Sequence, residues 1–256
     1  MRKKKFKFSD ARMFSWVLSH DIGLCGEFIS TVLGKDIEPL EVAIAESVEM
    51  PIPSAKQGRL DIKAKGGSNV YDIEMQIADL PDLARRARYY QGAMDVENLP
   101  MGEAYIELPE SYVIFLCLED FSKQGKPYHH YRMADGDDEL ADGRHVVFLA
   151  ANEYGKMEEG ELRSLLHYVS NGHVSSKQKL PAALEAAVHK ANEDEEAIMY
   201  MTEEAERAYR DKVIAQKQEE IKAKDAEIAA KNAEIDAKDA EIAMLKKMLG
   251  EAEGDH

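Results

Sequence analysis

Two stretches of alternating apolar and polar residues, joined by a short glycine-containing turn, constrain the fold of this chain more than any other feature. A period of two places alternate side chains on opposite faces of a strand. Residues 66–69 (Gly-Gly-Ser-Asn) are typical of a tight turn. The two stretches therefore predict an antiparallel hairpin with one apolar face, whose members are Leu60, Ile62, Ala64, Tyr71, Ile73, Met75 and Ile77.

The polar face of this hairpin collects Asp61, Lys63, Glu74 and Gln76. Two carboxylates that face one spot on adjacent strands repel each other unless a cation shares the space. Mg²⁺ takes oxygen ligands and is often held by one or two carboxylates together with a phosphate. A bound Mg²⁺ would acidify a water and stabilise the charge that builds on a scissile phosphate. Lys63, on the same face, would orient that water or neutralise the phosphate.

A solvated hairpin face is the ordinary alternative for the same alternation. Asp72 fits that alternative, since it falls on the polar face with no assigned chemistry. Periodicity alone therefore does not establish an enzyme, and both interpretations stay open at this point.

The flanking sequence predicts helices and strands in an order typical of an α/β core. Residues 9–34 predict two short helices, the second ended by Gly34, and residues 40–48 predict a strand. A helix over residues 81–94 separates the hairpin from a buried strand at 111–118, which suggests a right-handed crossover. Residues 144–150 predict a further strand, and the acidic stretch 135–143 predicts an exposed loop.

The run GRLDIKAKGGSNVYDIEMQ resembles the core of the PD-(D/E)xK nuclease superfamily. It is most similar to the recombination-promoting nuclease (Rpn) and putative-transposase family. Asp61 matches the Asp that this family carries on one strand, and Ile73-Glu74-Met75-Gln76 matches the aliphatic-Glu-x-Gln phrase of the next strand. The segments FISTVLG, RARYY and LPMGEAY also resemble the family, so that the likeness spans roughly residues 6–170.

The resemblance implies a fold, an activity and a set of site residues. The fold would be α/β, with a restriction-endonuclease-like core in which helices flank a mixed central sheet. The activity would be Mg²⁺-dependent DNA endonuclease, linked to recombination or mobile elements, with Mn²⁺ as a substitute and no organic cofactor. Asp61, Glu74 and the backbone carbonyl of Met75 would hold the metal, with Glu27 of an early helix as a further ligand.

Gln76 stands where most members of the superfamily carry Lys, and the Rpn-like family shares this substitution. A Gln side chain carries no charge and has no pKa to tune. Gln76 would therefore orient water or phosphate, and Lys63 is the first candidate to supply the positive charge.

The basic helix that follows the hairpin has two interpretations. Arg85, Arg86 and Arg88 would contact DNA phosphates, which supply most of the sequence-independent affinity for DNA. Alternatively, they form a solvated basic face. Tyr89 and Tyr90 would pack into the core or touch a sugar.

The C-terminal part repeats every seven residues, with Ile221, Ile228, Ile235 and Ile242 at one position. The second seam position carries Lys, Asp or Asn until Leu245, whereas a coiled coil needs two apolar columns. A self-associating helix that makes a homo-oligomer and a lone exposed helix held by i,i+4 pairs both fit. The predicted domains are a nuclease-like domain at 1–180, a helical connector at 181–214, a heptad-repeat helix at 215–250 and a disordered tail at 251–256.

Composition narrows the functional classes. The net charge of −16 counts against a general nucleic-acid binder, although a nuclease needs only a local basic strip. Cys25 and Cys117 are expected to be buried thiols, as in a reducing cytoplasm. No signal peptide or membrane-length apolar run is visible, so a soluble cytoplasmic protein is expected. His129 and His130 are expected in a surface loop.

Three functional hypotheses follow. The first is the DNA endonuclease. The second is a catalytically decayed DNA-binding or assembly module that oligomerises through its C-terminal helix, which the net charge and the missing motif Lys favour. The third is a coiled-coil scaffold with an incidental globular head.

Overall fold

The computed structural model of the 256-residue chain describes residues 5–48, 58–78, 81–174 and 178–202, with scattered positions between 217 and 238. Contacts divide the chain into two units, Met1–Met201 and Thr202–His256. Within the described residues, no helix has the length and apolar character needed to cross a membrane.

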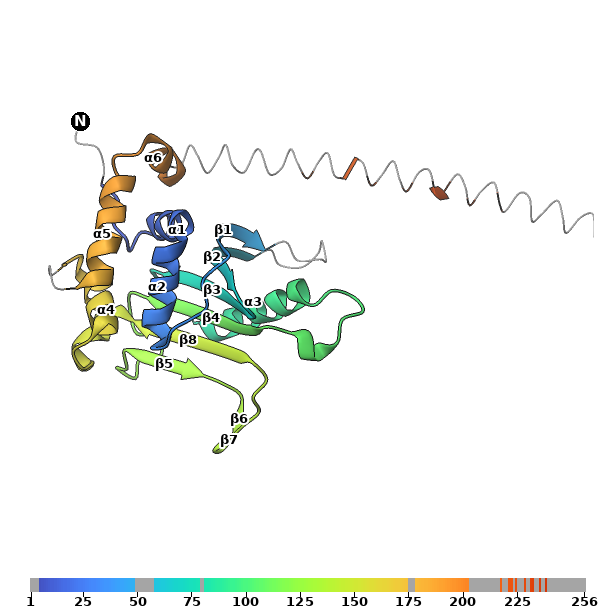
Figure 1. Cartoon of the computed structure of the whole chain (residues 1–256), viewed down its shortest axis with the longest axis horizontal. Helices are drawn as coiled ribbons and strands as arrows, with labels where there is room; N and C mark the ends of the chain where they lie inside the picture. The colour runs from blue at the N-terminus through green and yellow to red at the C-terminus, as the bar shows by residue number, and fades with distance from the viewer. Residues whose placement is uncertain are drawn as a thin grey trace, which may run out of the picture. The chain divides into compact units, whose positions relative to one another are not determined.

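A mixed six-stranded sheet forms the centre of the first unit, in the order β1-β2-β3-β4-β8-β5 (Figure 1). The pairs β1–β2, β2–β3 and β8–β5 are antiparallel, whereas β3, β4 and β8 run parallel. The strands are β1 Val42–Val48, β2 Gly58–Gly66, β3 Asn69–Gln76, β4 Glu110–Cys117, β5 Tyr128–Tyr131 and β8 Arg144–Ala150. A separate small ribbon pairs β6 (Ala134–Asp135) with β7 (Asp138–Glu139) inside the predicted acidic loop.

The predicted hairpin is confirmed as β2 and β3. Ile62 pairs with Ile73 and Lys63 pairs with Asp72, and the pairing ends at Gly66 and Asn69, on either side of the tight turn. Gly67 in that turn has a φ of +57°, a left-handed conformation that side chains other than glycine rarely adopt. A Cβ at this position would also collide with the carboxylate of Glu38. Glycine is therefore the favoured residue in the turn that sets the register of the hairpin.

The strand–helix–strand prediction is also confirmed. Helix α3 (Leu83–Asn98) connects β3 to β4, and the two strands pair in parallel from Asn69–Glu110 to Gln76–Cys117. Every residue of β4 after Glu110 is buried, because helices cover both faces of the sheet at this strand. This burial explains the uninterrupted apolar sequence of the strand.

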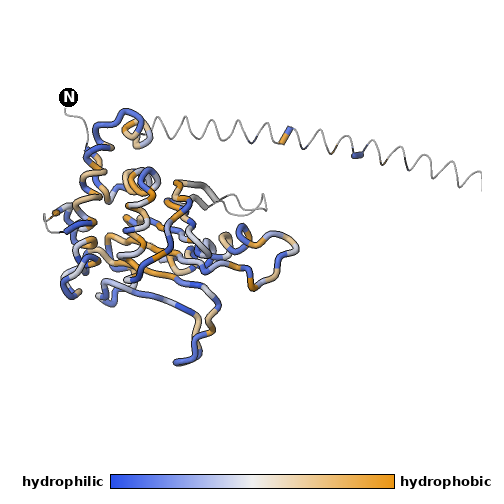
Figure 2. Tube along the Cα trace, in the orientation of Figure 1, coloured by the Kyte–Doolittle hydropathy of each residue, from blue (hydrophilic) through white to orange (hydrophobic). Residues whose placement is uncertain are grey.

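The helices form two layers of unequal size (Figure 1). The larger layer encloses a first core on one sheet face, and α3 encloses a second core on the other face. Figure 2 shows the hydrophobic residues gathered in the strands and the helix faces turned toward them. The larger layer contains α1 Ala11–His20, α2 Ile22–Leu33, α4 Glu161–Asn171, α5 Lys179–Ala191 and α6 Glu195–Met201, and the short 3-10 helices are η1 Tyr105–Glu107 and η2 Ala151–Lys156.

Two sequence-based boundaries differ from the structure. His129 and His130, expected in a loop, lie in β5, an edge strand that pairs with β8. Residues from 181 onward, expected as a connector, contribute to the first core through Leu184, Val188 and Met201. The compact unit therefore extends to Met201, because the apolar faces of α5 and α6 pack on the same sheet face as α1 and α2.

In the second unit, the described residues between 217 and 238 are helical. Ile221, Ile228 and Ile235 are each more than half exposed in the single chain. Ile242 and the predicted tail at 251–256 lie outside the described residues, and the heptad helix stays a prediction.

Candidate active site

The polar face of the hairpin is covered by protein. The side chains of Asp72, Glu74 and Gln76 are 0%, 1% and 7% exposed. Strand alternation turns them toward the second core, and α3 packs over that side of the sheet. The interpretation of Asp72 as part of a solvated face was therefore wrong, since a helix far from the hairpin turn shields it from water.

Asp61 and Glu74 meet on this buried face and are held by each other's strands. The backbone N–H of Asp61 donates to Oε1 of Glu74 at 2.9 Å. In return, Oδ2 of Asp61 accepts from the backbone N–H of Met75 at 2.9 Å. These bonds to backbone fix both carboxylates at one point between β2 and β3.

Arg86 brings a positive charge from α3 to the same point. Its guanidinium forms an ion pair with Oε2 of Glu74, and Nη1 donates to Oε1 of Gln76 at 3.0 Å. Nε donates to the hydroxyl of Tyr90 at 2.9 Å, one helical turn later. Arg86 therefore binds Glu74 and Gln76 within the folded protein, in contrast to a residue that contacts only solvent or DNA.

The other residues of the basic helix divide between surface and core. Arg85 and Arg88 are exposed. Tyr90 is buried in the second core and Tyr89 lies partly buried at its edge, so both tyrosines pack against protein, the first of the two predicted possibilities. The sequence contained a signal for Arg86, because Arg86 and Tyr90 are four residues apart and share a helix face.

Lys63, the first candidate for the positive charge, lies on the predicted face but has a different partner. Its ammonium pairs with Glu97 in the last turn of α3. The structure therefore brings Arg86, ten residues beyond Gln76, into direct contact with Glu74, while a carboxylate from the far end of the same helix neutralises Lys63.

Burial and mutual repulsion dominate the electrostatics of the site. Burial raises the pKa of Glu74, Asp61 raises it further, and Arg86 opposes both. Burial likewise raises the pKa of Asp72 well above its ordinary value, and Glu74 and Asp61 add to this effect. Neither carboxylate oxygen of Asp72 has a hydrogen-bond partner among the described residues. Burial and mutual repulsion therefore penalise the ionised forms of these carboxyl groups, and a cation bound beside them would relieve that penalty.

The donor set suits a hard divalent cation. Asp61 and Glu74 supply carboxylate oxygens, which Mg²⁺ prefers, and the orphaned oxygens of Asp72 lie on the same strand face as Glu74. Among the described residues, no group of three or more His, Cys, Asp or Glu side chains is arranged to hold a metal. A metal here would thus have two carboxylate ligands, and its other ligands would be a backbone carbonyl, substrate oxygens and water.

Glu27, the predicted further ligand, is exposed on α2. The buried residues of this helix all belong to the first core, on the other face of the sheet from Glu74. The structure does not bring Glu27 together with the two carboxylates.

The family model described as PD-(D/E)XK nuclease family transposase matches residues 11–226. The chain belongs to the PD-(D/E)XK nuclease family. The match includes the hairpin, α3 and the whole sheet, and it confirms the predicted resemblance to this family. Neither a curated protein nor a solved structure is significantly similar to the chain.

Membership in the PD-(D/E)XK family agrees with the architecture. A mixed central sheet flanked by helices is the predicted restriction-endonuclease-like arrangement, and the family supports a nuclease- or transposase-related role with DNA as the implied substrate.

Proposed function

We propose that this PD-(D/E)XK protein is a Mg²⁺-dependent DNA endonuclease that hydrolyses phosphodiester bonds in recombination or in the movement of mobile elements. The observation that carries the proposal is the interlocked pair Asp61 and Glu74 on a buried hairpin face. A structural hairpin gains nothing from burying repelling carboxylates, whereas a metal-dependent site requires them.

In this proposal, Asp61, Glu74 and the backbone carbonyl of Met75 hold Mg²⁺, with Mn²⁺ as a substitute. The bound metal supplies Lewis acidity toward the scissile phosphate and an acidified water. The chain contributes the preformed geometry, since the backbone bonds of Asp61 and Glu74 do not depend on the ion.

Gln76 and Arg86 have distinct roles. The Gln76 amide donates through Nε2 to the carbonyl of Ala78 and accepts from Arg86 through Oε1, so it is held in one orientation and positions its neighbours. Arg86 carries the permanent charge that Gln76 lacks. With five N–H donors, a guanidinium that binds Glu74 and Gln76 can still reach a phosphate oxygen.

Lys63 contributes a second cation on this face, held by Glu97. It would orient water or neutralise the phosphate when the substrate arrives. Arg85 and Arg88, exposed on α3, would contact phosphates of the same DNA.

Plasmid DNA provides the test. We expect nicking or cleavage with Mg²⁺ or Mn²⁺, none with EDTA, and none with Asp61→Ala or Glu74→Ala. Glu159→Ala, which removes an exposed carboxylate of the ion pair with Arg163, is the matched control and should cleave normally. Cleavage by Glu74→Ala at the wild-type rate would contradict the assignment of the site.

A second candidate function is a catalytically decayed DNA-binding or assembly module. The ion pair between Arg86 and Glu74 favours it, because Arg86 partly satisfies Glu74 without a metal. Titration separates the candidates. If the site is competent, Mg²⁺ or Mn²⁺ should stabilise the folded protein by RT ln(1 + [L]/Kd), which is measured as a rise in melting temperature. If the site is decayed, the melting temperature should not change.

The proposed protein is cytoplasmic and forms a homo-oligomer through its C-terminal helix. The exposure of Ile221, Ile228 and Ile235 supports self-association, since a partner helix would cover them. Sedimentation of the full chain and of a variant with all three changed to Lys would test it.

A further inference from the structure

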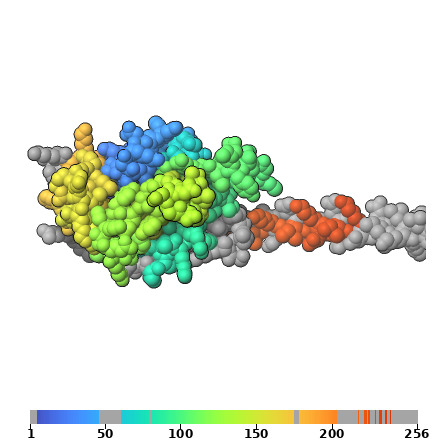
Figure 3. Space-filling view, turned by 90° about the horizontal axis from the view of Figure 1, so that it is seen from below, coloured from blue at the N-terminus to red at the C-terminus, as the bar shows by residue number. Residues whose placement is uncertain are grey.

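A groove of about 610 Å³ runs along the side of α3 that faces away from the hairpin. Its walls are α3 on one side and β8 with the segment after β5 on the other. Figure 3 shows the yellow-green surface of the β5–β8 segment next to the teal surface of α3. Because the sheet order places β2 and β3 on one flank of β4 and β8 and β5 on the other, α3 separates this groove from the carboxylate site.

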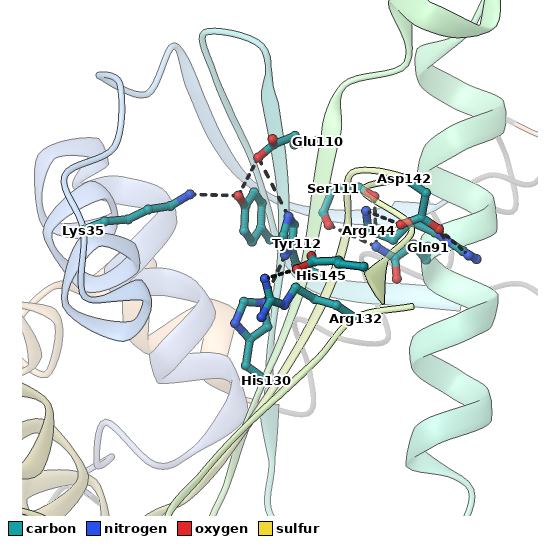
Figure 4. A network of polar contacts seen from close by, with 11 residues as sticks. Lys35, Gln91, Glu110, Ser111, Tyr112, His130, Arg132, Asp142, Arg144 and His145 are labelled. Carbon is teal, nitrogen blue, oxygen red and sulfur yellow. Dashed lines mark hydrogen bonds and ion pairs between the residues drawn. The ribbon is translucent and has the colours of Figure 1, made fainter. Parts of the chain in front are cut away.

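Three arginines line the groove, and they come from different parts of the chain. Arg88 of α3 has no ion pair or hydrogen bond within the described part of the chain. Arg132 pairs with Glu139 at 2.5 Å, and Arg144 donates through Nε to Asp142 at 2.6 Å. Figure 4 shows Arg144 held by Asp142 beside α3. The pair of Arg132 is exposed and that of Arg144 is partly exposed. Exposed pairs are weak in water, and each guanidinium has further N–H donors that an anion can use.

The floor of the groove is apolar and carries an aromatic wall. Phe121 stacks on Phe148 with ring centroids 4.1 Å apart. Tyr131 meets Phe148 edge to face at 6.0 Å, and the tyrosine is 46% exposed. A half-exposed ring packed against the buried ring of Phe148 is a stacking surface for a further aromatic group.

Gln91 of α3 adds a fixed polar atom on the wall opposite the aromatic rings. It is buried, and its Nε2 donates to both the carbonyl and the hydroxyl of Ser111, at 3.0 and 2.9 Å (Figure 4). Because the amide nitrogen is engaged, Oε1 is the atom that Gln91 offers to a ligand, as an acceptor for an N–H group. Asp95 is the acidic member of the lining; burial raises its pKa, and the nearby Arg144 opposes this rise.

We propose that this groove binds unpaired nucleotides of a single DNA strand, with a base on Tyr131 and backbone phosphates on Arg88, Arg132 and Arg144. The choice of DNA rests on the proposed function; the recognition of a base and a phosphate rests on the groove itself. A duplex hides its bases and has no use for an apolar floor, whereas an unpaired base stacks on an aromatic ring and leaves its phosphates to cations. The volume suits a ligand of nucleotide size.

The test measures binding without cleavage. Fluorescence anisotropy follows a fluorescein-labelled oligothymidylate of about ten nucleotides, with full-length protein in EDTA. We expect Tyr131→Ala and Tyr131→Leu to weaken binding about tenfold, and Tyr131→Phe to retain it. Leu keeps the apolar bulk without the stacking face, so a loss in both variants is not a loss of folding.

The salt dependence tests the phosphate contacts. Arg88→Ala should weaken binding and reduce the slope of log K against log salt by about 0.7, the value for one phosphate contact on a single strand. Arg163→Ala on α4, in the larger helix layer, removes the same charge and should leave binding and slope unchanged.

Three results would overturn the proposal. The first is that an unlabelled blunt duplex competes as strongly as the unlabelled single strand. The second is that thymidine monophosphate binds as tightly as the oligonucleotide. The third is that Arg85→Ala lowers the affinity for the oligonucleotide more than Arg88→Ala does. Glu74→Ala separates this proposal from the nuclease. If Glu74→Ala still binds the oligonucleotide, the binding proposal stands even if the wild type cleaves no DNA. If the wild type cleaves DNA with Mg²⁺ but the groove variants bind as the wild type does, the binding proposal fails and the nuclease proposal stands.

Discussion

Asp61 and Glu74 are bonded to each other's strands: the N–H of Asp61 donates to the Glu74 carboxylate, and the Asp61 carboxylate accepts from the N–H that follows Glu74. The two carboxylates thus replace part of the ordinary backbone pairing of the hairpin. Their position is set by backbone geometry, which is the kind of preorganisation that a metal-dependent site requires. The remaining charge of the site comes from Asp72 and Arg86, and each makes a separate prediction.

Replacing Asp72 by Asn should stabilise the protein near neutral pH. Because the folded-state pKa of Asp72 is raised, its carboxyl favours folding at low pH, and this contribution is lost as pH rises from the unfolded value of about 4 through the folded value. Urea unfolding should therefore show a higher free energy of unfolding for Asp72→Asn than for the wild type at pH 7, and little difference near pH 4.

The control for Asp72→Asn is Asp135→Asn in the exposed β6, which should be neutral at both pH values. A gain for Asp72→Asn that is equal at pH 4 and pH 7 would show that charge is not its cause.

Replacing Arg86 by Met should destabilise the protein in the absence of metal. The change leaves Glu74 buried without its cation and costs about 2–4 kcal/mol, less than a fully buried pair because Arg86 is partly exposed. Mg²⁺ should restore more stability to this variant than to the wild type, since the ion replaces the lost charge. Thermal unfolding with and without Mg²⁺ measures the difference.

Lys63→Met is the matched control for Arg86→Met. Its partner Glu97 is 45% exposed, against 1% for Glu74, so the loss of the Lys63 pair should change stability by less than about 1 kcal/mol. If Mg²⁺ stabilises Arg86→Met no more than wild type, Arg86 and the metal do not share Glu74.

The shared face of Asp61, Glu74 and Gln76 was predictable from sequence because it depends on local chemistry. A strand period of two and a glycine turn decide which side chains point together, and Gly67 sets the register. The crossover through α3 was predictable from the order of the elements, because a helix between two neighbouring strands is the usual connection of a parallel pair.

The covering of that face was not predictable in this way. It depends on α3 packing Leu83, Ala87 and Tyr90 against β4, and this non-local contact turns Arg86 toward Glu74. The four residues of β5 were likewise missed, because a strand so short has no periodic signal distinct from a loop. The groove beside α3 escaped notice because Arg88, Arg132 and Arg144 lie far apart in sequence.

Replacing Gln76 by Lys tests which residue supplies the charge of the site. If Arg86 supplies it, restoring the superfamily Lys should not raise the rate of plasmid cleavage and should lower stability, because a second cation would face the guanidinium that now binds Gln76. Gln76→Met, which removes the same hydrogen bond without adding charge, is the control. A rise in cleavage for Gln76→Lys would assign the missing charge to position 76 and not to Arg86.

Replacing Gly67 by Ala tests the turn on which the whole site depends. The left-handed φ of +57° costs about 1 kcal/mol for a residue with a Cβ, and the Cβ also meets the Glu38 carboxylate. Glu38→Ala in the same chain should recover the steric part and leave the backbone part, so a double-mutant cycle in urea should give a non-zero coupling. Gly67→Ala and the double variant should cleave DNA more slowly to the extent that the hairpin is destabilised, whereas Glu38→Ala alone should cleave at the wild-type rate. Strict additivity of the two changes would show that Glu38 does not limit this turn.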